Sequence, residues 1–104
     1  MIARIWHGWT TQDQAEAYEA LLRTEVFETI RHMEIAGYRG IELLRRQLAT
    51  EVEFITIMRF ETIDDIRAFA GEDYENAYVP DSARALLSRF DARSQHYQVR
   101  IART

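Results

Sequence analysis

The sequence contains no cysteine among its 104 residues. Disulfides, iron–sulfur clusters, thiolate ligation of haem and thiol nucleophiles are therefore excluded. It also has no apolar run near the roughly 18 residues of a membrane span, and its first residues lack the apolar segment of a signal peptide. We therefore expect a cytoplasmic protein with no membrane partner.

Glycine is scarce, and its four copies are scattered through the chain. They form no glycine-rich turn of the kind that holds a phosphate, so nucleotide cofactors are not expected. The basic residues are dispersed, with Arg45 and Arg46 as the only adjacent pair, and the net charge is -4. This pattern gives no reason to expect a nucleic-acid partner.

The length of the chain predicts one domain over residues 1–104 that gains from a partner. A domain of this size buries only roughly 60 to 65% of its unfolded surface. The segment 51–60 is apolar on both parities, which is typical of a strand covered on both faces. Helices cover one face of a four-stranded sheet, so either a second copy or a bound ligand must cover the other face. We expect a homodimer in which two sheets pack face to face.

Hydrophobic periodicity predicts two successive strand-helix-strand units, from Met1 to Leu48 and from Glu51 to Ala102. The first helix is expected to begin at a Thr11–Gln14 capping box and to end at Gly37. The expected strands span residues 2–9, 38–48, 51–60 and 94–102. The expected buried stripe of the first helix is Tyr18, Leu22, Val26, Ile30 and Met33.

The second half predicts a helix over 63–70, capped by Thr62 and closed by Gly71. Residues 72–79 are expected to form a short helical turn, and Asp81 is expected to cap a last helix over 82–90. The resulting order is β-α-β-β-α-β, an α+β ferredoxin-like fold with a four-stranded antiparallel sheet.

This order resembles the antibiotic-biosynthesis-monooxygenase-like family of dimeric α/β-barrel proteins. The resemblance rests on the strand 2–9, on the Phe60-Glu61-Thr62 step into the second helix, and on the stretch from Phe69 to Tyr78. It spans almost the whole chain and concerns order and pattern, so it is specific for the fold. It implies that two protomers form a barrel, each with a pocket beside its sheet. Members of the family include cofactor-independent oxygenases of phenols and quinols, haem-degrading enzymes and many proteins without an assigned activity.

The chain departs from two signatures of that family. Haem-degrading relatives carry Asn, Trp and His at places that hold His7, Phe69 and Tyr78 here, so degradation by that route is not expected. Phenol oxygenases carry Asn and Trp on the third strand, where this chain has Thr56 and Phe60. Tyrosine ligates haem iron in other folds, so haem binding through Tyr78 stays open as a minor alternative.

Two histidines are candidate bases, His7 on the first strand and His96 on the last. These strands are antiparallel in the expected fold, and a register with His7 opposite His96 avoids setting Arg4 against Arg100. Two imidazoles on one face of a pocket would supply a general base and a hydrogen-bond donor to a phenolate. The alternative is two separate histidines bonded to backbone or water.

Four further side chains are candidate ligand contacts. Arg59 ends an apolar strand and could bind an oxyanion, or it could form an ion pair with Glu61 or Asp64. Tyr74 and Tyr78, four residues apart, could line a pocket or form the buried side of a helical turn. Trp6 and Trp9 fall on opposite strand faces, so at most one meets a ligand, and Trp9 is the candidate.

No metal site is expected, because the histidines show no local ligand spacing and His32 lies near a helix end. The favoured hypothesis is a dimeric, cofactor-independent monooxygenase-like oxidoreductase acting on a small aromatic, phenolic or quinol-type compound. In it His96 or His7 is the base, and Arg59 or Tyr78 holds the oxyanion. The competing hypothesis is a non-enzymatic dimer that binds a small ligand.

Overall fold

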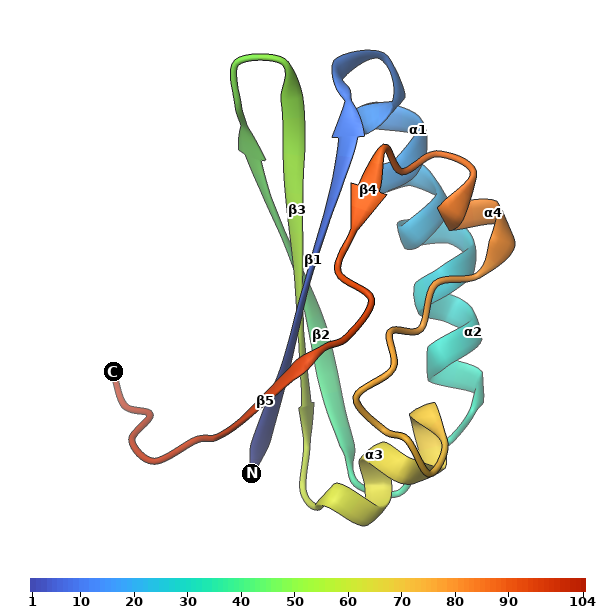
Figure 1. Cartoon of the computed structure of the whole chain (residues 1–104). Helices are drawn as coiled ribbons and strands as arrows, with labels where there is room; N and C mark the ends of the chain where they lie inside the picture. The colour runs from blue at the N-terminus through green and yellow to red at the C-terminus, as the bar shows by residue number, and fades with distance from the viewer.

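The computed structural model describes all 104 residues and has one helical layer on one side of an antiparallel sheet (Figure 1). The long strands are β1 (Ile2–Thr11), β2 (Tyr38–Gln47) and β3 (Glu51–Phe60). They lie in the order β2-β3-β1, and the short strands β4 (Arg89–Phe90) and β5 (Gln95–Gln98) both pair with the outer side of β1. The predicted ferredoxin-like α+β fold is confirmed.

The first helical segment is continuous but contains a π-helical turn. Its predicted stripe is buried at Tyr18, Leu22, Val26 and Ile30. Four-residue spacings rotate by about 40° per step on an ideal α-helix, so this stripe would drift off the sheet. The extra residue of the π turn cancels most of that drift and keeps the stripe inward. The segment comprises η1 (Gln12–Gln14), α1 (Ala15–Leu21), η2 (Leu22–Val26, the π turn) and α2 (Phe27–His32).

Both predicted ends of this helix are corrected by the structure. Thr11 makes no side-chain cap because the chain enters the helix through a 3-10 turn instead. Met33 is 38% exposed, and the left-handed residue after the helix is Glu34, with φ of 52°, rather than Gly37. Gly37 is needed for another reason, since a Cβ there would lie 1.8 Å from the Asp65 carboxylate.

The helix α3 (Ile63–Ala70) has the predicted bounds. Thr62 and Asp65 form a reciprocal capping box, and Gly71 closes the helix with φ of 94°. The elements that follow differ from the prediction. Residues 72–79 contain no helix, Pro80 rather than Asp81 is the N-cap, and α4 (Asp81–Arg84) is short. The chain leaves α4 early because it returns to the sheet edge, where the Ser88 amide donates to the carbonyl of Trp9 at 2.8 Å.

The hydrophobic core lies between the sheet and the helices. Alternate residues of β3 are buried there, and Phe54 packs edge-on against Tyr18 with ring centroids 4.9 Å apart. The other parity, including Ile55 and Ile57, is half-buried, and no helix covers that face. We call it the open face of the sheet. None of the helices is long and apolar enough to cross a membrane.

Candidate functional site

The two faces of β1 carry different candidate residues. Its even-numbered residues, Arg4 and Trp6 among them, face the helices together with the buried residues of β3. Its odd-numbered residues, including His7 and Trp9, lie on the open face. Because side chains alternate strictly along a strand, each candidate belongs to one face only.

The predicted histidine pair is wrong, because β5 sets His96 opposite Arg4 and not opposite His7. The observed register differs from the predicted one by an odd number of residues, which moves every side chain of the strand to the other face. His96 therefore faces the helices, whereas His7 lies on the open face.

A detour between β4 and β5 explains this register. After Asp91, whose amide still donates to the carbonyl of His7, residues 92–94 leave the sheet and their backbone bonds to the loop after α3. The Ala77 amide donates to the carbonyl of Ala92 at 3.0 Å, and the Ser94 amide donates to the carbonyl of Glu75 at 2.7 Å. The expected continuous strand 94–102 is thus reduced to residues 95–98.

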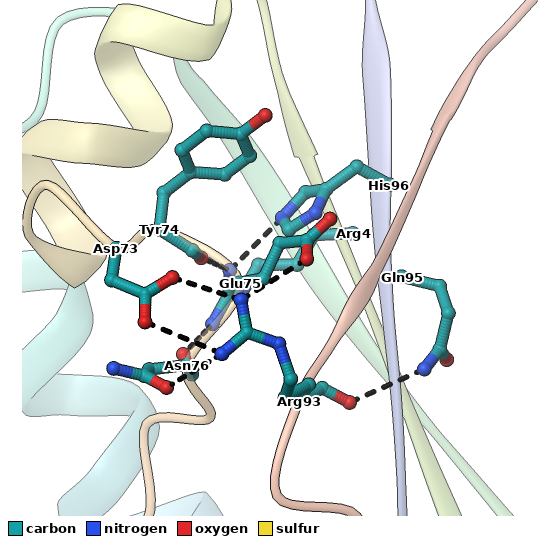
Figure 2. A network of polar contacts seen from close by, with 8 residues as sticks. All are labelled: Arg4, Asp73, Tyr74, Glu75, Asn76, Arg93, Gln95 and His96. Atoms are coloured by element: carbon teal, nitrogen blue, oxygen red, sulfur yellow. Dashed lines mark hydrogen bonds and ion pairs between the residues drawn. The ribbon is translucent and has the colours of Figure 1, made fainter.

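Arg4 is the centre of the polar network on the helix face (Figure 2). Its side chain is buried, with 3% of the residue exposed, and it donates to the carbonyls of Tyr74 and Asn76 and to Nε2 of His96. Its guanidinium also lies 5.4 Å from the ring centroid of Phe69. Burial lowers the pKa of Arg4 to about 10, which still leaves the guanidinium charged at neutral pH.

His96 is held as a neutral imidazole. Its Nε2 lies 2.9 Å from Nη1 of Arg4, and because arginine only donates, Nε2 is the acceptor and the proton is on Nδ1. That Nδ1 is buried without a hydrogen-bond partner. Burial, and then the charge of Arg4, lower the pKa of His96 below its ordinary value, while Glu75 opposes the shift.

Next to Arg4 a cavity of about 40 Å³ opens between the sheet and the helices. Most of its lining side chains are apolar, and Arg4 is the one that carries a charge. The π turn contributes Leu22 and Val26 to the wall. A cavity of this volume holds about three water molecules, so a larger ligand requires its walls to move. The lining includes Trp6, Met58, Phe69, Tyr78 and Val79.

The loop over this site is held from outside by Arg93. Its guanidinium bonds to Asp73 at 2.9 Å, to Glu75 at 3.1 Å and to the side chain of Asn76 at 3.2 Å (Figure 2). Arg4 holds the backbone of the same segment from inside. Residues 73–76, which we call the clasped segment, therefore lie between two arginines.

Both predicted tyrosines lie on this side of the sheet, though not on a helical turn. The Tyr74 ring packs edge-on against His96 with ring centroids 5.2 Å apart, and Arg67 lies over the same tyrosine ring at 5.3 Å. Tyr78 lines the cavity, packs against Phe69 and is 36% exposed. The Tyr78 side chain can therefore contact both water outside the cavity and a ligand inside it.

The remaining predicted residues lie on the open face. Nδ1 of His7 donates to the carboxylate of Glu53 at 3.1 Å, and the His7 ring stacks on Trp9 with centroids 6.1 Å apart. Arg59 pairs with Glu42 on the neighbouring strand at 2.7 Å, and not with Glu61 or Asp64. Cross-strand neighbours thus determine the partner of Arg59 rather than residues adjacent in sequence.

Sequence reasoning did not single out Arg4, although a signal was present. On the parity of β1 that carries Ile2 and Trp6, Arg4 is a lone charge on an otherwise apolar face. Trp6 rather than Trp9 is the tryptophan at the cavity. No three histidine or carboxylate side chains converge in an arrangement that could hold a metal ion.

No family model matches this chain, and no curated protein matches its sequence. A solved structure does match, that of a candidate antibiotic biosynthesis monooxygenase from Bacillus cereus, with a TM-score of 0.68 and 11% sequence identity. The match covers 100% of this chain and 95% of the other. At this identity the likeness shows the fold, a monooxygenase-like fold, and the fold alone.

Proposed function

We propose that this chain is a cofactor-independent monooxygenase-like oxidoreductase that acts on a small phenolic or quinol-type aromatic compound. The observation that carries the proposal is an apolar cavity with a buried cation, Arg4, in its wall, and a neutral imidazole, His96, bonded to that cation from outside the lining. A neutral imidazole keeps one basic nitrogen, here Nε2, which accepts from Arg4, and an apolar cavity suits an aromatic ring.

In the proposed reaction Nε2 of His96 gives up its hydrogen bond from Arg4 and takes a proton from the substrate, and the hydroxyl of Tyr78 donates to the substrate oxygen. The resulting electron-rich carbanion reacts with O₂ directly. In the keto tautomer of such a phenol, conversion of the ring CH₂ with O₂ into C=O and H₂O balances in atoms and electrons, so no external reductant is needed. Of the two predicted bases we favour His96, because His7 is bound to Glu53 on the open face.

Tyr74 has a supporting role in the proposal, since its ring packs on His96 and its carbonyl accepts from Arg4. Arg59 and Trp9 lie on the open face, where we propose that a second copy of the chain packs. That face exposes several large apolar side chains between its ion pairs, a surface that single domains rarely leave uncovered. Light scattering that returns a dimer mass would support this homodimer, and a monomer mass at micromolar concentration would contradict it. The large apolar side chains on the open face are Ile5, Leu44, Ile55, Ile57 and Tyr97.

One observation favours the second candidate function, a non-enzymatic small-ligand-binding dimer. The cavity of about 40 Å³ is smaller than an aromatic ring needs, so a substrate enters only if Tyr78 and the loop that carries it move outward. A protein that only binds a ligand does not also have to bring the substrate to His96, which does not line the cavity. Haem binding through Tyr78 would demand a far larger opening.

O₂ uptake tests the proposal. Haem-free protein is incubated with a panel of quinols and polycyclic phenols beside the variants His96→Gln, His7→Gln and His32→Gln. We expect uptake by the wild type and a roughly hundredfold loss in His96→Gln, the usual scale of general-base catalysis. His32 is exposed at the end of α2 and serves as the matched control.

Uptake that survives in His96→Gln and is lost in His7→Gln would move the base to the open face. No uptake above the buffer blank across the panel would reject the oxygenase and leave the binding module. A Soret band on titration of the wild type with haem that is absent in Tyr78→Phe would support the haem alternative.

A further inference from the structure

Arg4 carries a charge that the protein itself does not neutralise. No carboxylate oxygen lies within 4.0 Å of its guanidinium, whereas the carboxylates nearest to the clasped segment pair with Arg93. Arg4 is 3% exposed and has apolar neighbours on its strand face. A buried charge is unfavourable unless it is paired, so this arrangement lacks one component, an anion.

The hydrogen bonds of Arg4 leave a free edge on the guanidinium. Both Nη1 protons are used, by the Tyr74 carbonyl and by Nε2 of His96, and one Nη2 proton is used by the Asn76 carbonyl. Arginine has five N–H donors, so Nε–H and the second Nη2–H make no hydrogen bond to the protein. Adjacent nitrogens of this kind match the two oxygens of a carboxylate.

Holding the loop does not account for the charge. A neutral donor would satisfy the carbonyls of Tyr74 and Asn76 equally well, without the cost of burying a cation. Arg93 moreover already fixes the same segment from the solvent side, with two carboxylates as partners. The positive charge of Arg4 therefore needs another explanation.

The cavity supplies that explanation. Arg4 lines it together with apolar and aromatic side chains such as Trp6, Met58 and Phe69. A cavity with apolar walls and one cation is complementary to a ligand that has a flat apolar body and one anionic group. We propose that Arg4 anchors the carboxylate of an aromatic acid in this cavity, through its free Nε–Nη2 edge. This assignment deepens the proposed function, on which it rests for the location of the ligand, by making the substrate an aromatic carboxylate.

Benzoate and its neutral isostere benzamide test the anchor. Dissociation constants are measured at pH 7.5 by ligand-observed saturation-transfer NMR. We expect the wild type to bind benzoate at least tenfold more tightly than benzamide. The preference should disappear in Arg4→Gln and persist in part in Arg4→Lys, which keeps the charge and loses the fork. Arg31→Gln, which removes an exposed arginine paired with Glu28, should keep the full preference.

A second measurement needs no substitution, so it remains decisive if the Arg4 variants fail to fold. In methyl-labelled wild type, nuclear Overhauser effects from the benzoate ring should reach Met58 and Val79 at the cavity. Effects to Ile55 and Leu44 instead would put the acid on the open face and overturn the proposal. Equal binding of benzoate and benzamide, or an acid preference that survives in folded Arg4→Gln, would also overturn it.

These outcomes are separate from those of the O₂ experiment, because benzoate binding involves no oxidation. Acid-selective binding without O₂ uptake would reject the oxygenase and keep the anchor. O₂ uptake with neutral phenols, together with equal binding of benzoate and benzamide, would keep the oxygenase and reject the anchor.

Discussion

Arg4 and Arg93 hold the same segment of chain from opposite sides, and their environments differ in almost every respect. Arg93 is exposed and bonds to the side chains of Asp73 and Glu75, which raises its pKa and lowers that of Asp73. Arg4 is buried, bonds only to carbonyls and an imidazole, and burial lowers its pKa. The comparison separates an arginine whose charge is matched within the chain from one whose charge is available to a ligand.

The largest expected effect is on stability, from Arg4→Met. The substitution leaves the buried carbonyls of Tyr74 and Asn76 without donors, and each buried acceptor that loses its partner costs about 1–3 kcal/mol. Relief of the buried charge offsets part of that loss, so we expect the free energy of unfolding to fall by about 2–4 kcal/mol. Urea denaturation measures it, with Arg31→Gln as the exposed control.

A fall that is no larger for Arg4→Met than for Arg31→Gln would show that burying the charge costs as much as its hydrogen bonds return. Arg4 would then contribute as little to folding as the exposed Arg31, and what distinguishes Arg4 would be ligand binding alone.

The next effect is a pH dependence through His96, whose pKa is lowered first by its burial and then by the charge of Arg4. Because the folded pKa of His96 is lowered, the unfolded state binds the proton more readily. Its contribution to stability is therefore fully present above the unfolded pKa of about 6.5 and is lost as the pH falls through the folded pKa. Urea midpoints between pH 7.5 and 5.5 should decline in the wild type and decline less in His96→Gln.

His32→Gln is the matched histidine control for that series, since His32 is exposed and lies outside the network. If His96→Gln has the same pH slope as the wild type, the neutral imidazole inferred from the Arg4 contact is contradicted.

The smallest effect is expected for Arg93→Gln. Its ion pairs are fully exposed, and such pairs contribute little and are screened by salt. We expect a small loss of stability that shrinks further in 1 M NaCl, together with faster hydrogen exchange of the Ala77 and Ser94 amides that join the two loops. Hydrogen-exchange NMR at low and high salt measures this. A loss as large as that of Arg4→Met would place the main attachment of the segment on its outer side.

Much of the fold could be predicted from local pattern, and the edge of the sheet could not. The helix 63–70 has the bounds that Thr62 and Gly71 predicted, because a cap and a left-handed glycine act within a few residues. The strand 51–60 is likewise as predicted. The helix expected over 82–90 failed because its end is decided by contact with β1, through Ser88 and Phe90, rather than by its own periodicity.

The candidate site was predictable in its residue types and not in its grouping. His96, Tyr74 and Tyr78 do share one side of the sheet, while His7, Arg59 and Trp9 share the other. All 13 basic residues of the chain are arginines, so composition gives no sign that one of them is buried. The face of Arg4 could be inferred from the alternation of β1, but its lack of a carboxylate partner could not.

The sequence by itself determined the order of elements, the stripe of the long helix and the two faces of each strand, because these follow from the periods of helix and strand. Only the tertiary structure decided how β5 is aligned with β1. The backbone bonds of Ala92 and Ser94 to Ala77 and Glu75 join parts of the chain far apart in sequence, and they set His96 beside Arg4. Since a shift of one residue turns a strand over, that long-range choice decided which histidine meets the buried charge.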